Sequence, residues 1–118
     1  MKNFLINGDF SKNISPFDRG LSFGDGVFRT FLVVNGRVVN WDLQYKKLKS
    51  DAAKLKIKAP LKKDLVIDIK KLFSSNRTYI GKVIITRGLS NQGYQFDKNI
   101  KSTRILLKIN HSKIKKEL

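Results

Sequence analysis

The residues best suited to chemistry lie near the N-terminus, in the stretch FGDGVF at positions 23–28. Two glycines flank Asp25 there, and glycine lets a backbone come close to another backbone or to a ligand. The same pattern also fits a bulged entry into a β-strand. A P-loop is excluded because no GK[ST] follows. Two other carboxylates, Asp9 and Asp18, precede Asp25, but their spacing does not predict a catalytic carboxylate pair.

Other common catalytic and metal-binding patterns are poorly supported. The single histidine, His111, lies in a basic tail, which argues against a Ser-His-Asp triad and against a histidine metal site. There is no cysteine, so disulfides and cysteine-ligated metals are excluded. We therefore predict no metal site.

The bulk composition predicts one soluble domain. The chain has 118 residues, 41% of them hydrophobic, and a formal net charge of +16. This charge fits either a nucleic-acid partner or a lysine-rich solvated surface, and the even spread from Lys2 to Lys116 favours the surface. The apolar run at residues 4–6 is too short for a signal peptide or a membrane span. We predict a cytoplasmic protein.

Hydrophobic periodicity predicts the elements that must position the glycine-rich stretch. A short strand is expected at residues 4–6, followed by a loop at 11–17. Two apolar runs at residues 27–34 and 37–39 flank Asn35-Gly36, which is the strongest short-range indication of a β-hairpin.

The second half of the chain predicts helices followed by strands. Asp42 is the expected N-cap of a helix that ends near Ile57. A second helix is expected over residues 61–73, and strands over 79–86 and 103–109. The fold class is α+β: a mixed or antiparallel sheet with a β-hairpin and two helices. We expect one domain at residues 1–110, with residues 111–118 forming a basic tail or the start of an interdomain linker.

Several stretches, taken in order, resemble the N-terminal half of the fold-type-IV pyridoxal-phosphate enzymes. They are INGDF, DRGLSFGDGVFRT, NGRVVNWDLQYKKLKSDAAKLKI, KVIITRGLSNQGY and STRILL. The family includes branched-chain and D-amino-acid aminotransferases and 4-amino-4-deoxychorismate lyase. FGDGVFRT and the later ITRG, GY and TRIL stretches are most similar to the lyase. The resemblance implies the small domain of the fold-type-IV fold.

The resemblance implies pyridoxal 5'-phosphate as the cofactor and Lys47 as a cofactor-binding residue. In the family, a helix carrying His, two residues and then Arg-Leu binds the cofactor phosphate. Here Gln44 stands at the His position and Lys47 at the Arg position. Lysine offers a point charge but not a bidentate fork, so looser phosphate binding is expected.

The resemblance also implies a substrate-binding set of Phe28, Arg29, Arg87 and Tyr94. Phe28 matches an aromatic position on the substrate side of the cofactor, and Arg29 stands where transaminases more often carry Glu. Arg87 matches a position that binds a substrate carboxylate in some members. Tyr94 lies in the loop after Arg87 and could close over a substrate at a subunit boundary.

Two further residues are expected to support the loop without touching substrate. Asp18 and Arg19 precede the glycine-rich stretch, and we expect them to fix it by capping and by a salt bridge.

The chemistry of this family needs a Schiff-base lysine. By resemblance, that lysine belongs to a second, larger domain, which we expect to be absent from this chain. The chain would then be a piece of a longer enzyme or a natural truncated product, catalytically inactive alone. Its expected partners are the missing large domain or a second subunit in a homodimer, and a small-molecule substrate; no nucleic acid and no membrane are expected.

The function expected by resemblance is that of an aminodeoxychorismate lyase, which forms 4-aminobenzoate and pyruvate for folate biosynthesis. Two alternatives stay open: an amino-acid transaminase of the same fold, and a catalytically dead remnant. From another class, a small basic nucleic-acid-binding module also remains.

Overall fold

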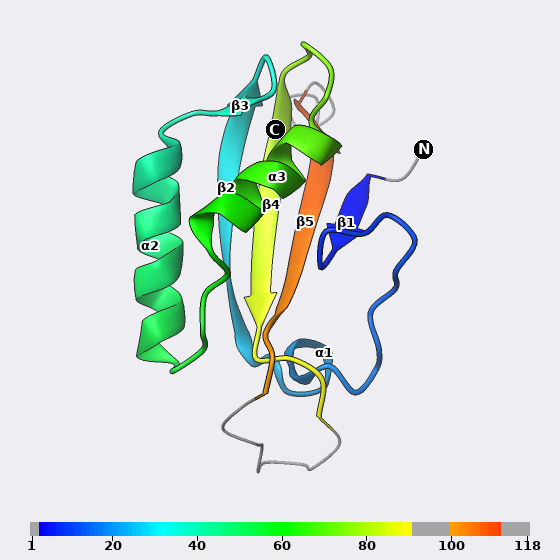
Figure 1. Ribbon diagram of the computed structural model, residues 1–118, viewed down its shortest axis with the longest axis vertical. Helices are drawn as coiled ribbons and strands as arrows, with labels where there is room; N and C mark the ends of the chain where they lie inside the picture. Colours follow the sequence, from blue (N-terminus) through cyan, green and yellow to red (C-terminus); the bar gives the residue numbers. More distant parts are fainter. Residues whose placement is uncertain (1–2, 91–99, 112–118) are drawn as a thin grey trace.

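A five-stranded antiparallel sheet forms the centre of the molecule (Figure 1). The structure, a computed structural model, describes residues 3–90 and 100–111. The strand order is β1-β5-β4-β2-β3, and every pairing is antiparallel. The strands are β1 (Phe4–Ile6), β2 (Gly26–Val34), β3 (Arg37–Val38), β4 (Tyr79–Thr86) and β5 (Thr103–Asn110). The helices are α1 (Arg19–Phe23), α2 (Trp41–Lys54) and α3 (Lys62–Leu72). The predicted α+β class is confirmed, and the sheet is antiparallel.

The predicted hairpin joins β2 to β3. Val33 pairs with Val38, and Val34 pairs with Arg37. The two residues between them, Asn35 and Gly36, have φ angles of 51° and 74°. Asparagine and glycine tolerate this left-handed conformation best, which is why this pair closes a two-residue hairpin loop.

The helix boundaries differ from prediction at the start of α2. The N-cap is Asn40, in the left-handed conformation with φ 57°, and it makes no side-chain cap hydrogen bond. The prediction of Asp42 as N-cap is wrong. Asp42 lies in the first turn and forms a salt bridge with Lys62, the first residue of α3. An acidic side chain in the first turn still stabilises the helix, because its negative charge interacts favourably with the positive end of the helix dipole. α1 was not predicted at all.

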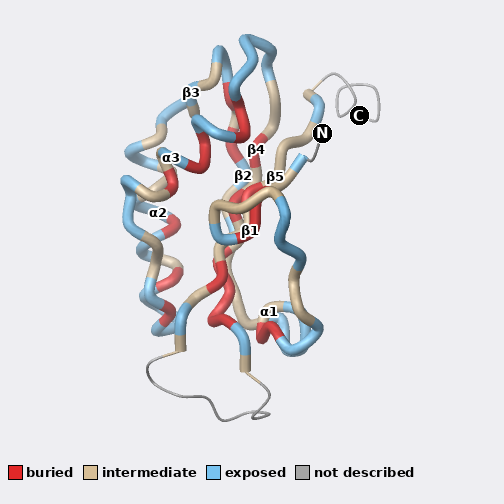
Figure 2. The backbone as a smooth tube through the Cα atoms, turned by 45° about the vertical axis from the view of Figure 1, so that its right-hand side comes forward, coloured by how far each residue is buried: buried red, intermediate tan, exposed pale blue. Residues whose placement is uncertain are grey.

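The hydrophobic core lies between the sheet and the two long helices. Alternate residues of β2 and β4 face these helices, and α2 and α3 contribute their buried stripes (Figure 2). The most buried members include Leu5, Val33, Leu48, Ala52, Leu65, Phe73, Val83 and Ile85. Burying a Val, Leu or Ile side chain stabilises a fold by about 1.5–3 kcal/mol.

The charged residues of β5 also face the helix layer. Arg104 donates from Nε to Oδ2 of Asp68 on α3 at 2.6 Å, and Asp68 is only 2% exposed. Lys108 donates from Nζ to the carbonyl of Leu72 at 3.3 Å. These contacts tie α3 to the sheet. Leu106 lies on this face too and is buried in the core, whereas Ile105 and Leu107 lie on the opposite face of the sheet.

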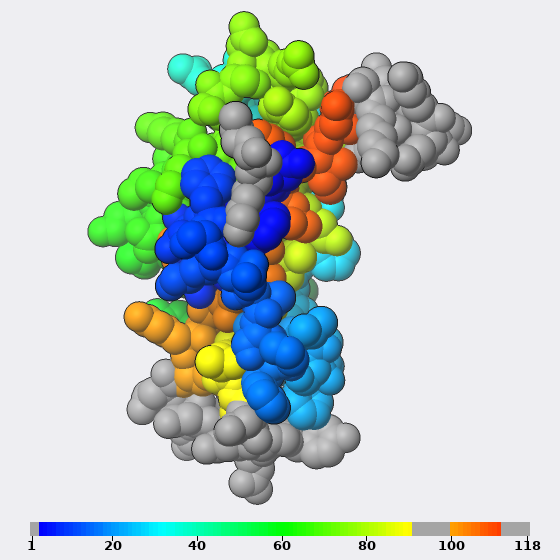
Figure 3. Space-filling model, turned by 90° about the vertical axis from the view of Figure 1, so that its right-hand side faces the viewer, coloured from blue at the N-terminus to red at the C-terminus, as the bar shows by residue number. Residues whose placement is uncertain are grey.

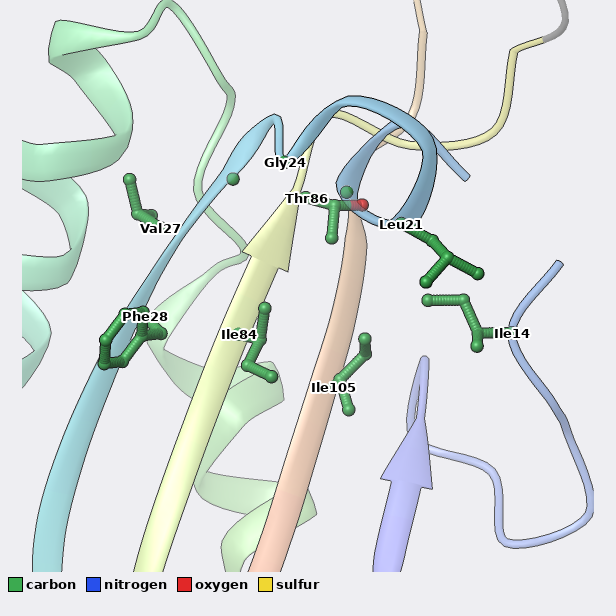
Figure 4. Close-up of a pocket in the computed structure, with 10 residues that line it drawn as sticks. Ile14, Leu21, Gly24, Val27, Phe28, Ile84, Thr86 and Ile105 are labelled. Atoms are coloured by element: carbon green, nitrogen blue, oxygen red, sulfur yellow. The ribbon is translucent and has the colours of Figure 1, made fainter. Parts of the chain in front are cut away.

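This opposite face is apolar and largely uncovered. Phe28 pairs with Ile84 across β2 and β4, and Ile84 pairs with Ile105 across β4 and β5, so the three side chains share one face. Phe28 is 59% exposed. α1 and the segment before it run along one side of the molecule (Figure 3) and reach this face near one end, where Leu21 and Ile14 lie beside it (Figure 4). We call it the open face.

Neither long helix could act as a membrane span. No helix in the described ranges combines the length and the apolar content that crossing a bilayer needs.

Candidate functional site

The glycine-rich stretch forms a short helix followed by a tight entry into β2. Asp18 caps α1, because its Oδ1 accepts from the backbone N–H of Gly20 at 2.9 Å. Gly24 ends α1 with a φ of 64°, which is the left-handed conformation typical of a helix C-terminus. At Gly26 a Cβ atom would meet the carbonyl oxygen of Ile85 at 2.7 Å. Glycine is thus required at position 26 for close approach to β4.

Asp25 is the centre of an ion-pair cluster between loop and sheet. Its Oδ2 accepts from Nε of Arg87 at 2.6 Å and from Nε of Arg19 at 3.2 Å. Its Oδ1 accepts from Nη2 of Arg87 at 3.3 Å. Arg19 and Arg87 are both buried, at 4% and 8% exposed. The expected roles of Asp18 and Arg19, capping and a salt bridge, match this geometry.

Arg87 also reaches the C-terminal end of α2. Its Nη2 donates to the carbonyl of Leu55 at 2.7 Å, and its Nη1 donates to the carbonyl of Lys56 at 3.3 Å. One guanidinium therefore joins the end of β4, the glycine-rich stretch and the end of α2. Sequence reasoning did not find this role, because Asp25 and Arg87 are separated by 62 positions.

The cluster changes the pKa of Asp25. Partial burial acts to raise this pKa, but the hydrogen bonds and positive charges of Arg87 and Arg19 outweigh burial and hold it below the ordinary value of 3.8. Asp25 is therefore a stable anion at neutral pH. Such a group suits a structural anchor and does not suit a general acid or base, which needs a pKa near the working pH.

An apolar pocket of about 300 Å³ lies beside this loop on the open face (Figure 4). Its lining includes Ile14, Leu21, Phe28, Ile84, Thr86 and Ile105. Phe28 stands on β2 at one side, and Ile14 and Leu21 approach each other at the other side. The Nζ of Lys82 lies 4.4 Å from the centre of the Phe28 ring. We call this the sheet-face pocket. It can hold a flat apolar group, and its lining offers no acid, base or nucleophile beyond the Thr86 hydroxyl.

Phe28 and Arg29 do not share a face of the sheet. Successive side chains of a strand point to opposite sides, and Arg29 is directed to the helix layer, where its Nε donates to Oε1 of Gln44 on α2 at 3.1 Å. Lys47 follows Gln44 by three positions, so it lies on the adjoining part of the same helix surface. Its side chain is exposed. The structure thus links β2 to the part of α2 that carries Lys47.

The five predicted site residues are only partly brought together. Phe28 borders the sheet-face pocket, and Arg29 connects to the helix of Lys47. Arg87 is directed to Asp25 rather than into the pocket. Tyr94 lies outside the described residues. Among residues 3–90 and 100–111, no cluster of three or more His, Asp or Glu side chains is placed to hold a metal ion.

Comparisons with known proteins identify the fold. No protein-family model matches the chain. The 4-amino-4-deoxychorismate lyase of Pseudomonas aeruginosa matches 91% of the chain with a TM-score of 0.77 and 27% sequence identity. A hypothetical aminotransferase from Mycobacterium tuberculosis, in its PLP-bound form, matches 91% with a TM-score of 0.70 and 17% identity, which shows the fold alone. In fold, the chain matches the small domain of the fold-type-IV pyridoxal-phosphate enzymes.

The sequence comparison matches a different enzyme of this fold. The chain is 32% identical over 77 residues to the D-alanine aminotransferase of Listeria monocytogenes, a match that covers 63% of the chain. The chain spans only 27% of the length of that relative and 39% of the length of the lyase.

Two separate surfaces of the described residues, one on α2 and one on the open face, offer chemistry that suits pyridoxal phosphate, but the structure does not bring them together. Lys47 offers an exposed cation for a phosphate, on a helix surface that Gln44 and Arg29 hold against β2. The sheet-face pocket offers an apolar wall. No enclosing second wall appears among the described residues, so they do not form a complete cofactor site.

Proposed function

We propose that this chain is the N-terminal domain of a pyridoxal-phosphate-dependent lyase resembling 4-amino-4-deoxychorismate lyase. The observation that carries the proposal is the match to that lyase: a TM-score of 0.77 at 27% identity over 91% of the chain. The complete enzyme would release pyruvate from aminodeoxychorismate and leave 4-aminobenzoate for folate biosynthesis. The chain alone would be inactive, because the Schiff-base lysine would come from a larger domain.

The proposed site residues take roles that follow from their contacts. Phe28 would contact the substrate, since its ring is exposed beside the sheet-face pocket. Lys47 would contact the cofactor phosphate. Arg29 would position Lys47 through Gln44, and Arg87 would position the loop beside Phe28 through Asp25. Both guanidinium groups are already hydrogen-bonded inside the domain. Tyr94 remains a proposed substrate contact.

The open face supports a proposed partner. Solvent-exposed apolar patches on folded domains commonly mark interaction sites. Phe28 and Leu21 are 59% and 61% exposed on or beside this face. We propose that the large domain of the same enzyme covers it, and that the complete enzyme is a homodimer.

An amino-acid transaminase is the second candidate, and a specific observation favours it. The curated relatives are D-alanine aminotransferases, at 32% identity over 77 residues in the Listeria case. The two candidates differ in product: a transaminase converts D-alanine to a keto acid and consumes an acceptor, whereas the lyase yields 4-aminobenzoate.

Two chimeras test the proposal. The chain replaces the matching N-terminal segment in the Pseudomonas lyase and, separately, in the Listeria D-alanine aminotransferase. Pyridoxal-phosphate absorbance, 4-aminobenzoate formation and D-alanine transamination are then measured in both. We expect cofactor binding in both and restored activity in the lyase chimera alone. Activity in the transaminase chimera alone would favour the second candidate, and two chimeras that fold without binding cofactor would contradict both.

Matched controls make the result specific to the proposed site. Phe28 and Phe17 are each 59% exposed, but Phe17 does not line the sheet-face pocket. In the active chimera, Phe28→Ala should lower the rate about tenfold, which corresponds to about 1.4 kcal/mol, whereas Phe17→Ala should leave it unchanged. Borohydride treatment of the isolated chain with pyridoxal phosphate should give no stoichiometric adduct.

A further inference from the structure

A second cleft is lined by residues of the β2–β3 hairpin, the start of α2 and α3. The hairpin lies at the opposite end of the sheet from α1 (Figure 1). The cleft measures about 270 Å³. Its lining includes Arg37, Val38, Trp41, Val66, Ile69 and Lys70. β3 supplies the first two, α2 begins with Trp41, and α3 supplies the last three. We call it the hairpin cleft. Its size approaches that of small-ligand sites.

Trp41, one of the residues that line the cleft, is held in place by aromatic contacts. Its ring packs against Phe31 and Tyr45, with centroid distances of 6.2 and 5.9 Å. These contacts fix the indole. Its Nε1–H is buried and has no acceptor among the described residues. Because this atom is buried, it is not offered to a molecule in the cleft, so the indole contributes only apolar surface there.

The charges around the cleft have one sign. Arg37 and Lys70 both line it, one from the hairpin and one from α3, and no carboxylate is among the lining residues. Within the described ranges, neither cation takes part in an ion pair. The cleft therefore combines an apolar floor with donors and positive charge, and its side chains supply no acceptor.

We propose that the hairpin cleft binds a small organic anion with an apolar body, such as a short aliphatic carboxylate. Val38, Val66 and Ile69 contact the hydrocarbon, while Arg37 and Lys70 attract the anionic group. This assignment follows from the cleft alone and does not depend on the proposed lyase function.

The chain carries its own reporter for the test, because Trp41 is its single tryptophan. Hexanoate is titrated into the full chain while tryptophan emission is recorded, with hexanamide as the neutral probe of the same shape. We expect a saturable change with a dissociation constant on the order of 1 mM, as for a small fragment. Hexanamide should bind about fivefold more weakly, since it lacks the charge-assisted contacts.

Matched variants decide whether the cleft is responsible. Lys70→Gln and Arg37→Gln should each weaken hexanoate binding about threefold or more, and Val66→Phe should abolish it by filling the cleft. Lys63→Gln is the control, because Lys63 is an exposed lysine of the same helix that does not line the cleft. Circular dichroism confirms folding, and the two charge variants remain informative if Val66→Phe does not fold. No saturable change, equal affinity for hexanamide, or equal weakening by Lys63→Gln would overturn the proposal.

Discussion

The Nε of Arg87 lies 2.6 Å from Oδ2 of Asp25, and this contact joins the end of β4 to the glycine-rich stretch. The backbone repeats the connection, because the N–H of Arg87 donates to the carbonyl of Asp25 at 3.0 Å. Side chain and main chain thus fix the same two residues. The arrangement places the loop beside Phe28 and the sheet-face pocket.

Replacing Asp25 with Asn should destabilise the domain by about 2 kcal/mol. The substitution leaves two buried guanidinium groups without their carboxylate, and partners of charged hydrogen bonds are costly to remove. Urea unfolding at neutral pH measures the change. Asp51→Asn is the control, because Asp51 forms only an exposed pair with Lys54 at 3.9 Å and should cost under about 0.5 kcal/mol. Equal losses in the two variants would contradict the structural role of Asp25.

The stability contributed by Asp25 should depend on pH. Its pKa is lowered in the folded domain, so the ionised form favours folding. This contribution is fully present above the ordinary pKa of 3.8 and is lost as pH falls through the lower folded pKa. Unfolding followed between neutral and strongly acidic pH should show a steeper acid loss in the wild type than in Asp25→Asn. Parallel curves for the two proteins would show that Asp25 is not the group responsible.

Substitution by alanine should lower the stability of the domain by different amounts at two glycines of the same loop. Gly26→Ala should cost about 2–3 kcal/mol, because its Cβ would lie 2.7 Å from the backbone oxygen of Ile85. At Gly24 a Cβ atom would meet no atom within 4 Å. Gly24→Ala should therefore lower the stability by only about 1–2 kcal/mol, which is the cost of the left-handed conformation at φ 64°. Thermal unfolding of both variants gives the comparison. A larger loss at Gly24 would contradict the close approach of β2 to β4.

Lys56→Gly should stabilise the domain by about 1 kcal/mol. Lys56 follows α2 with a φ of 58°, a conformation that glycine adopts without steric cost. Its carbonyl oxygen, which accepts from Arg87, is kept by the substitution. The matched control is Lys54→Gly, inside the last turn of α2, which should destabilise by about 1 kcal/mol. Denaturant midpoints of the two variants should move in opposite directions from the wild type.

Lys47→Arg should strengthen cofactor binding in the active chimera. Arginine can grip a phosphate with two parallel hydrogen bonds, whereas lysine offers one point charge. We expect pyridoxal-phosphate affinity to rise about threefold to tenfold, and Lys47→Gln to lower it by a similar factor. Lys49→Arg, another exposed position of α2, should change nothing. An unchanged pyridoxal-phosphate affinity in all three variants would contradict a contact between Lys47 and the cofactor phosphate.

Local sequence patterns predicted most of the fold. Asn35-Gly36 marked the hairpin because both residues tolerate positive φ, and the apolar run of β4 matches Tyr79–Thr86 residue for residue. α1 was not predicted, because it has only five residues and contains Gly20. A segment this short does not show a helical repeat of apolar residues. At α2, Asn40 begins the helix with a left-handed backbone instead of a side-chain cap, which moved the start two residues ahead of Asp42.

The candidate site was harder to predict, for a physical reason. Phe28 and Lys47 could be named by resemblance, and the structure places Phe28 beside a pocket. The pairing of Asp25 with Arg87, and that of Asp68 with Arg104, joins residues 62 and 36 positions apart. Such contacts depend on strand order, and strand order does not follow from the spacing of apolar residues. The orphan donor of Trp41 is likewise a property of packing.

The lengths of the outer strands bear on how this small domain avoids forming aggregates. β1 has three residues and β3 has two, so each edge of the sheet exposes few unpaired backbone groups. Short edge strands offer little template for another chain to extend the sheet. β4 is paired along its length by β2 and β5, whereas β1 covers only residues 105–107 of β5 and β3 covers only Val33 and Val34 of β2. The short outer strands therefore limit growth of the sheet into fibrils at β1 and β3 themselves, in a chain that also carries an open apolar face.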